Sequence, residues 1–208
     1  PFPIQHLSAL KVIEVFSGEA KLSATLVAAG ATVLPAWDKV DGNRCAGERH
    51  PVLVEDLLQP SSVERLRAAI ADPEGANFIH FNFPRRPFAA GAPRSSRSTW
   101  RPSGENKSQS EKDGNQLADT VAALCELTLQ HQKRFVIQSP NGNLVWLMPS
   151  LLRLQGHTET FSVIVDPDQA NRPQWRLLTN AIELRPLTTR RTDEKLPRGH
   201  GRPQGHGS

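Results

Sequence analysis

The sequence predicts an α/β fold built on a doubly wound, mostly parallel sheet. Short apolar segments typical of strands alternate along the chain with segments typical of helices. The first strand runs directly into a small-residue turn and then a helical pattern, as in a βαβ unit. The chain has 208 residues, which is enough for one sizeable core. We therefore expect one domain over residues 1–190 and a basic, flexible tail over 191–208, whose Gly, Pro, His and Arg cannot bury a core.

The first βαβ unit is expected to form a nucleotide-type cofactor pocket. A strand at 11–15 precedes a turn that contains Gly18, a helix at 18–29 and a second strand at 31–36. The glycine lets the backbone approach a ligand closely, and the start of the helix offers unpaired N–H groups. Asp38 lies about 20 residues beyond the turn, where an acidic residue commonly holds a ribose. An ordinary βαβ unit without a ligand is the alternative.

The remaining elements follow from the same patterns. Further strands are expected at 52–56, 77–81, 134–137, 161–165 and 181–184. A helix is expected at 61–71, where a serine followed by Glu64 can cap the first turn, and another at 115–130. Residues 85–113 are rich in Arg, Ser, Pro and Gly and have no periodicity. They are expected to form a long loop, and a loop of this length is usually functional or disordered.

The basic residues cluster, although the net charge is only +4 and the sequence pI is about 9.5. The first cluster, in the long loop, consists of Arg85, Arg86, Arg94, Arg97 and Arg101. The second consists of Arg185, Arg190, Arg191, Lys195, Arg198 and Arg202. Such clusters suit a polyanion such as nucleic acid, DNA or RNA, and solvated loops are the alternative. The chain has no Tyr and only 6% aromatic residues, so base-stacking platforms are not expected.

Several features point to a soluble intracellular protein, either nuclear or cytoplasmic. No run approaches the roughly 18 apolar residues of a membrane span, and no charged-then-apolar leader is present. The chain starts at Pro1, which predicts a processed protein or a segment of a longer one. Cys45 and Cys125 lack metal-binding spacing and are too few for a disulfide framework. A reducing compartment and no metal site are therefore expected.

Five short motifs at the ends of the predicted strands form one pattern: residues 14–18, 37–39, 56–57, 81–84 and 138–140. Their order resembles that of the S-adenosylmethionine-dependent DNA cytosine-C5 methyltransferases, and most of all their short, divergent relatives. The resemblance extends over residues 11–146, roughly two thirds of the chain. It implies a Rossmann-like fold of the class I methyltransferase type, with S-adenosylmethionine as the cofactor.

The resemblance also implies a cofactor site in two parts. The Phe-x-Gly turn of the family holds the methionine part, which here gives Phe16, Ser17 and Gly18, with Pro84 beside them. Phe16 as a simple core aromatic is the alternative.

The adenosine part would fall to three residues after the next strands. Trp37 would stack on adenine, and Asp38, or a neighbour in a shifted register, would meet the ribose hydroxyls. Asp56 would accept from the adenine amino group. Trp37 as a core aromatic and Asp56 as a helix or turn cap are the alternatives.

Both catalytic groups of the family are missing. A Pro-Cys pair normally supplies the thiolate that attacks the flipped cytosine, but here Pro84 is followed by Arg85. A guanidinium stays protonated and cannot serve as that nucleophile. The Glu-Asn-Pro motif of the family is replaced by Gln138-Ser139-Pro140. Cys125 lies on an apolar helix, where a structural role is expected, and Cys45 is far from the site in sequence.

Three hypotheses remain. The favoured one is a methyltransferase-like pseudoenzyme whose Arg-rich loop binds nucleic acid or a protein. The second is an active methyltransferase on a nitrogen or oxygen atom, which needs positioning but no thiol. For that chemistry, His80 and Asn82 are weak catalytic candidates, and His80 as a satisfied strand-end histidine is the alternative. The third is a structural subunit of a larger assembly with RNA or protein.

Overall fold

The computed structural model describes residues 4–40, 50–89, 95–166 and 173–187. The strands are β1 (Lys11–Val15), β2 (Thr32–Val33), β3 (Ala36–Asp38), β4 (Val52–Val54), β5 (Phe78–Asn82), β6 (Arg134–Pro140), β7 (Phe161–Val165) and β8 (Trp175–Thr179). The α-helices are α1 (Lys21–Ala28), α2 (Pro60–Ala71), α3 (Gln109–Gln130) and α4 (Pro149–Gln155). The 3-10 helices are η1 (Ile4–Ala9), η2 (Arg86–Phe88), η3 (Leu144–Leu147) and η4 (Ile182–Leu187). The expected tail at 191–208 lies outside the described residues.

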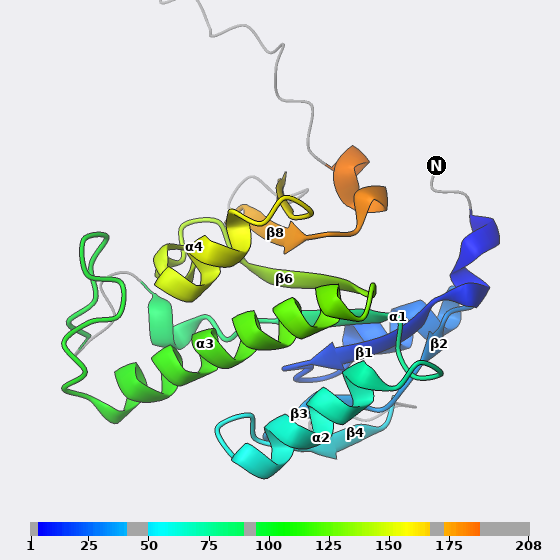
Figure 1. Cartoon of the computed structure of the whole chain (residues 1–208), viewed down its shortest axis with the longest axis horizontal. Helices are drawn as coiled ribbons and strands as arrows, with labels where there is room; N and C mark the ends of the chain where they lie inside the picture. The colour runs from blue at the N-terminus through cyan, green and yellow to red at the C-terminus, as the bar shows by residue number, and fades with distance from the viewer. Residues whose placement is uncertain (1–3, 41–49, 90–94, 167–172, 188–208) are drawn as a thin grey trace, which may run out of the picture.

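All the strands in the described parts of the chain join one sheet, in the order β4-β3-β1-β5-β6-β8-β7, with β2 beside β1 (Figure 1). The pairings from β4 across to β6 are parallel, whereas β8 is antiparallel to both β6 and β7. Leaving out the two-residue β2, the parallel strands follow the 3-2-1-4-5 order of a doubly wound sheet. The predicted Rossmann-like, doubly wound and mostly parallel sheet is therefore confirmed.

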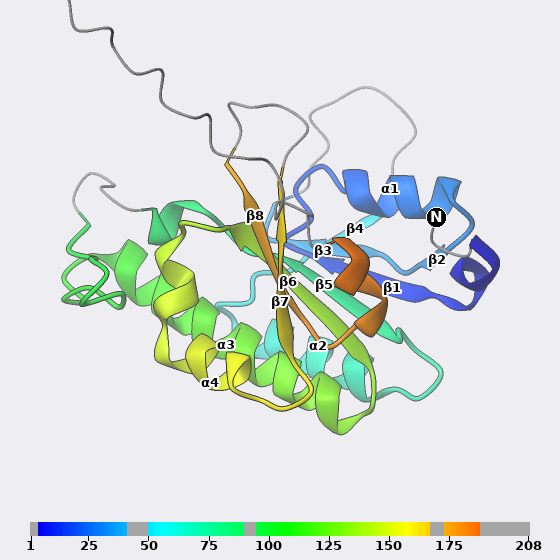
Figure 2. The ribbon, with the colours of Figure 1, turned by 90° about the horizontal axis from the view of Figure 1, so that it is seen from above.

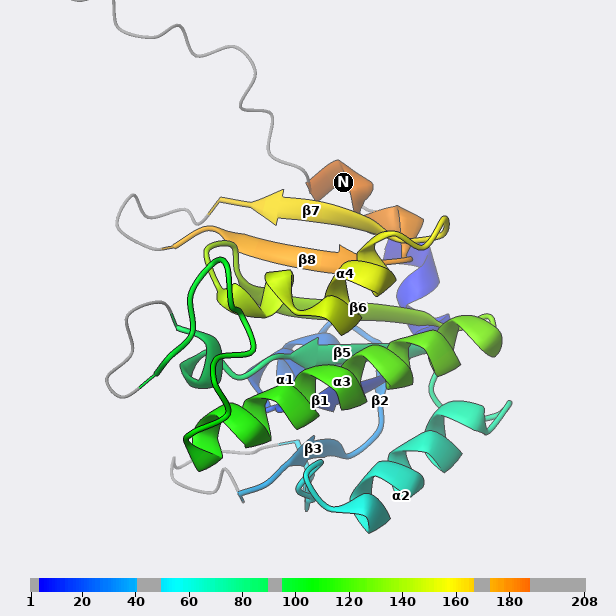
Figure 3. The same ribbon diagram turned by 60° about the vertical axis from the view of Figure 1, so that its left-hand side comes forward.

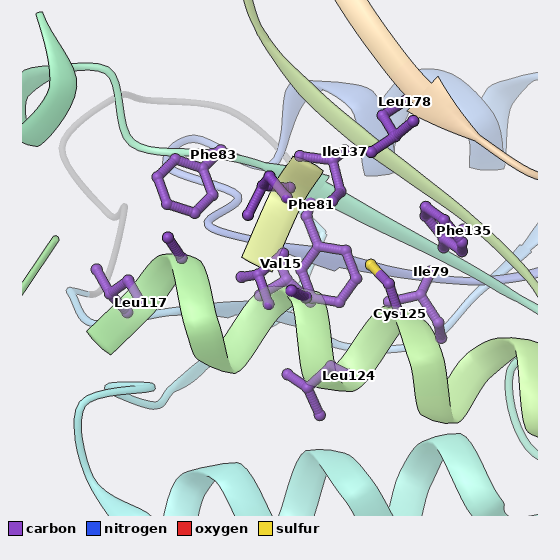
Figure 4. Packing of buried hydrophobic residues seen from close by; sticks show 14 of the residues in the cluster. Val15, Ile79, Phe81, Phe83, Leu117, Leu124, Cys125, Phe135, Ile137 and Leu178 are labelled. Atoms are coloured by element: carbon purple, nitrogen blue, oxygen red, sulfur yellow. The ribbon is translucent and has the colours of Figure 1, made fainter. Parts of the chain in front are cut away.

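Helices cover both faces of this sheet (Figure 2). The first helix, α1, and η4 lie on one face, and α2, α3 and α4 lie on the other. The main core fills the space between the strands and α3, where Ile79, Phe81, Phe135 and Leu124 are fully buried (Figure 4). Near-continuous apolar strands such as β5 are typical of parallel sheets that are covered on both sides.

The part of the chain that the structure describes contains no helix both long and apolar enough to cross a membrane.

The helix α3 begins earlier than the sequence predicts. Ser108 caps its N-terminus, because its Oγ accepts a hydrogen bond from the Glu111 backbone N–H at 3.2 Å. The helix therefore starts at Gln109 rather than at residue 115. The prediction placed these residues in the loop because the first two turns carry almost no apolar side chains, although Ser108 and Glu111 have the spacing of a capping pair.

Two predicted strands differ from the structure. The expected strand at 31–36 is two short ones, β2 and β3, and Pro35, which has no N–H to donate to a sheet, lies between them. The expected strand at 181–184 is wrong: most of that segment belongs to η4, and the last strand of the described residues is β8. The apolar residues of 175–179 and of 181–184 suit a strand equally well in the sequence. Pairing decides between them, because β8 pairs with β6 on one side and with β7 on the other.

Candidate functional site

The predicted site residues gather at one edge of the sheet, because the carboxyl ends of β1, β3, β4, β5 and β6 meet there. In Figure 3 the arrowheads of β5 and β7 point towards this edge, and that of β8 points away from it. In open α/β sheets, ligands bind in the crevice outside these carboxyl ends. This edge is therefore the candidate site of the protein.

The turn after β1 has an unusual backbone. Phe16, Gly18 and Ala20 all have positive φ, at 58°, 56° and 49°. Only glycine adopts this region freely, so the conformations of Phe16 and Ala20 are strained. The Ser17 N–H donates to the carbonyl of Trp37 at 3.2 Å, and the Ala20 N–H donates to the Ser17 carbonyl at 2.9 Å. Strain held in this way is concentrated at functional sites in proteins.

Space and unused polar capacity remain at this turn. A Cβ added to Gly18 would have no atom within 4 Å, so the backbone here faces open space. The Gly18 N–H donates to Asp38 Oδ2 at 2.8 Å, and the Val40 N–H donates to Asp38 Oδ1 at 3.1 Å. The Ser17 hydroxyl is buried and has no hydrogen-bond partner among the described residues. Asp38 thus ties the turn to the end of β3 beside an unsatisfied hydroxyl.

The two other predicted adenosine residues already have roles within the protein. Trp37 is only 6% exposed and packs in the core. Asp56 Oδ1 accepts from the Leu58 N–H at 3.0 Å, which forms a turn after β4. These are the contacts of a core aromatic and of a turn cap, and a cofactor role for either residue stays a prediction.

Aromatic side chains line the next part of the edge. The Phe16 ring packs edge-to-face on Phe83, with centroids 5.9 Å apart, and Phe83 packs similarly on Phe88 at 5.7 Å. Pro84 follows Phe83 and is partly exposed. These contacts fix the chain that leads from β5 to Arg85.

The position expected for a nucleophile holds a stacked guanidinium. The Arg85 Cζ lies 4.3 Å from the centroid of the Trp175 ring on β8. The Asn143 side chain donates to the Arg85 carbonyl at 3.2 Å. Cys125 does not replace a catalytic thiol, because its side chain on α3 is buried in the core and faces the strands beside Ile79 (Figure 4). Burial raises the pKa of Cys125 well above its usual value, and Cys45 lies outside the described residues.

A polar group occupies the sheet face covered by α1. The His80 Nε2 donates to Gln138 Oε1 at 3.0 Å, so the structure brings these two predicted residues together. Asn82 pairs in register with Gln138 across β5 and β6. Burial lowers the pKa of His80 to about 4, so the ring is neutral at pH 7. Its Nδ1 is buried without a hydrogen-bond partner among the described residues, and a role for His80 as a base stays a prediction.

Glu14 has a role that the sequence did not assign. Its carboxylate, next to His80 in the sheet register, accepts from the N–H of Ser23 at 2.9 Å and from its hydroxyl at 2.5 Å. This fastens the first turn of α1 to β1. Burial raises the pKa of Glu14 above its usual value. A carboxylate inside an apolar strand is the sequence signal for such a contact, because a buried charge needs partners.

The arginines of the long loop do not form one surface. Arg97 is only 7% exposed, and its guanidinium donates to the carbonyls of Pro102 and Glu111 and to Asn115 Oδ1. In this conformation Arg97 therefore holds the loop together and does not face solvent. Arg86 is exposed, and Arg101 pairs with Glu105 at 2.7 Å. Arg94 lies outside the described residues.

In the second basic cluster, Arg185 lies 4.9 Å from the centroid of the Phe161 ring. The other members, Arg190, Arg191, Lys195, Arg198 and Arg202, lie outside the described residues.

Three comparisons relate the chain to known proteins. No family model matches the chain, and no curated protein matches its sequence. Among solved structures, it is similar to a SAM dependent methyltransferase from Archaeoglobus fulgidus, with a TM-score of 0.48 and 11% sequence identity. That match covers 85% of this chain and 88% of the other. The assignment of fold class accordingly stands on the strand order of the sheet.

Proposed function

We propose that this protein is a DNA cytosine-C5 methyltransferase-like pseudoenzyme that keeps the fold and the cofactor site but not the covalent chemistry. The observation that supports this most directly is the stack of Arg85 on Trp175. A guanidinium is not a nucleophile at any working pH, so Arg85 cannot attack a cytosine ring. Gln138, in place of the family's glutamate, is hydrogen-bonded to His80.

S-adenosylmethionine is the proposed ligand, and the turn after β1 fits it. Gly18 faces open space, and the Ser17 hydroxyl lacks a partner among the described residues. Phe16 and Gly18 would hold the methionine part and Asp38 the ribose. Asp56 would accept from the adenine amino group through Oδ2, since Oδ1 is used by Leu58. When bound, this cofactor supplies an activated methyl group.

Calorimetric titration with S-adenosylmethionine and with its demethylated product tests the cofactor proposal. Asp56→Asn keeps the turn acceptor but places an amide donor where an acceptor is needed, so we expect it to weaken binding at least about tenfold. Asp72→Asn is the matched control, because Asp72 makes the same kind of turn with Glu74, at the end of α2. Equal binding by both variants, or no heat with the wild-type protein, would contradict the proposal.

A methyl-transfer assay separates the pseudoenzyme from its alternatives. We expect cofactor binding without transfer to DNA, RNA or protein. Transfer to a nitrogen or oxygen atom would instead support the second hypothesis, with His80 and Asn82 as the residues to test first. If the cofactor does not bind and the protein is stable only in a complex, the structural-subunit hypothesis is favoured.

We also propose nucleic acid as the partner. Arg86 is exposed at the same sheet edge and makes no ion pair among the described residues, and Arg85 and Arg101 are exposed nearby in the chain. Together with a pI of about 9.5, these cations favour a polyanion. A protein partner is the alternative, and a binding assay against DNA and RNA at several salt concentrations decides between them.

A further inference from the structure

Trp100 is the most exposed large apolar side chain in the part of the molecule that the structure describes, at 96%. It lies in a tight turn in which Ser98 and Arg101 exchange two backbone hydrogen bonds, both 3.1 Å long. The turn therefore presents the indole at the tip of the loop. Such exposure of tryptophan is uncommon in a folded chain and needs an explanation.

The loop that carries Trp100, residues 95–107, is held firmly on α3. The buried Glu111 carboxylate accepts from the N–H of Ser96 at 2.6 Å, from its hydroxyl at 2.7 Å and from the Lys107 N–H at 3.2 Å. A Cβ at Gly104 would come within 2.6 Å of Glu111 Oε1, so only glycine fits there. Arg97 adds its three hydrogen bonds from the other side. The buried side chains of Glu111 and Arg97 thus fix the loop that carries the exposed Trp100 indole.

A pocket of about 720 Å³ adjoins the same loop. Ser103 and Asn106 from the loop line it, together with Lys112 on α3 and Arg153 on α4. Neither cation has a hydrogen bond or ion pair within the described ranges, and Asp119 is the single carboxylate in the lining, so the pocket is net positive. Free cations in a concave site suit a phosphate group.

We propose that the Trp100 loop and this pocket bind single-stranded nucleic acid, with a base stacked on Trp100 and the backbone phosphates near Lys112 and Arg153. Sites for single strands combine stacking on aromatic side chains with a positively charged groove. A protein hot spot is less well supported, because such anchors lie within a fully desolvated patch, whereas Ser98, Thr99 and Arg101 around Trp100 are exposed and polar. This inference rests on the proposed nucleic-acid partner and names the residues and the kind of strand.

Fluorescence and anisotropy titrations with a single-stranded oligodeoxynucleotide of about 12 residues, a length within typical site sizes, test it. The other three tryptophans are less exposed, so Trp100 dominates the solvent-exposed emission. We expect quenching by the oligonucleotide and none by an abasic strand of equal length. Trp100→Ala should weaken binding at least about fivefold without changing its salt dependence, and Trp100→Phe should retain most of the affinity. Val27→Ala, which trims an exposed apolar residue on α1, is the control.

The pocket is tested separately through the salt dependence. Lys112→Gln and Arg153→Gln should each lower the slope of log affinity against log salt by about 0.7, because each variant makes one phosphate contact fewer. Arg67→Gln on α2 removes the same charge elsewhere and should leave the slope unchanged. Suppose that the oligonucleotide binds, that Trp100→Ala binds it as tightly as the wild type does, and that the abasic strand quenches the emission as the oligonucleotide does. The inference is then overturned while the proposed partner stands. If no DNA or RNA binds, both are overturned, and a protein that binds through Trp100 replaces them.

Discussion

Arg85 and Trp175 are 90 positions apart in the sequence, yet the Arg85 guanidinium lies 4.3 Å from the centre of the Trp175 ring. The contact joins the end of β5 to β8, the antiparallel strand inserted between β6 and β7. Arg85 is exposed and Trp175 is partly buried, and a cation–π contact near the surface contributes about 0.5–1 kcal/mol. Arg85 therefore has a packing role at the position where the family resemblance implies a nucleophile.

Arg85→Cys should not restore cytosine methylation. The thiol would stand in the right place in the motif, but Gln138 would still replace the carboxylate that acts on the ring. We also expect the unfolding free energy to fall by about 0.5–1 kcal/mol because the stack on Trp175 is removed. Transfer of a labelled methyl group to DNA measures the first effect, and urea titration the second. Methyl transfer by this single variant would contradict this prediction, because it would show that Gln138 suffices and that Arg85 alone accounts for the missing activity.

Arg86 and Arg97 should differ in their effect on nucleic-acid binding. Arg86→Gln removes an exposed cation, so the salt slope on duplex DNA should fall by about 0.9 for each phosphate that Arg86 neutralises in the wild type. Arg97→Gln should leave the slope unchanged and instead destabilise the fold by about 1–3 kcal/mol, because it leaves the carbonyls of Pro102 and Glu111 without their charged donor. Binding titrations at several salt concentrations and denaturant unfolding of both variants check this. If Arg97→Gln lowers the salt slope and leaves the unfolding free energy unchanged, the structural role of Arg97 is contradicted.

The centre of the parallel half of the sheet could be predicted because most residues of β1 and β5 are buried. Segments such as 11–15 and 134–137 are mainly apolar, and each has a turn or helix signal next to it. The turn at Gly18 and the carboxylate of Asp38 could be placed by their spacing, and a hydrogen bond of 2.8 Å joins them. The local sequence pattern was sufficient to predict these elements, because the residues within each element determine its structure.

The loop at 95–107 could not be predicted because contacts distant in sequence decide its structure. By type, Arg97 is expected at the surface, whereas a tryptophan is expected to be largely covered. The structure reverses this: Arg97 is buried over the Phe88 ring at 4.0 Å, and Trp100 is exposed. The carbonyls that bind Arg97 come together only when the loop has closed on α3. No periodic pattern in the local sequence indicates this closure.

Gly114→Ala should destabilise the protein although alanine favours a helix. In an exposed helix interior the change would stabilise by about 1 kcal/mol. Here the new Cβ would lie 2.8 Å from the Cβ of Pro87 and 2.9 Å from Nη2 of Arg97, and overpacking costs about 1–3 kcal/mol. Denaturant unfolding measures the sign of the change in unfolding free energy. Gly142→Ala is the control, because a Cβ there meets nothing within 4 Å. A stability gain in Gly114→Ala would mean that Arg97 does not pack against α3.

His80 should make the protein less stable as the pH falls. Its pKa is lowered from 6.5 to about 4 by burial, so between these values the unfolded chain binds a proton that the folded protein does not. The unfolding free energy should therefore decrease from pH 6.5 down to about pH 4, by about 3 kcal/mol in all. His80→Gln keeps a donor for Gln138 but does not titrate, so we expect it to lack this part of the slope, while His157→Gln at an exposed position keeps it. Denaturant titrations of the three proteins across this range measure the difference. If the unfolding free energies of wild type and His80→Gln depend on pH in the same way, the folded protein can protonate the His80 ring as readily as the unfolded chain does. Its Nδ1 is then accessible, and His80 again becomes a candidate base.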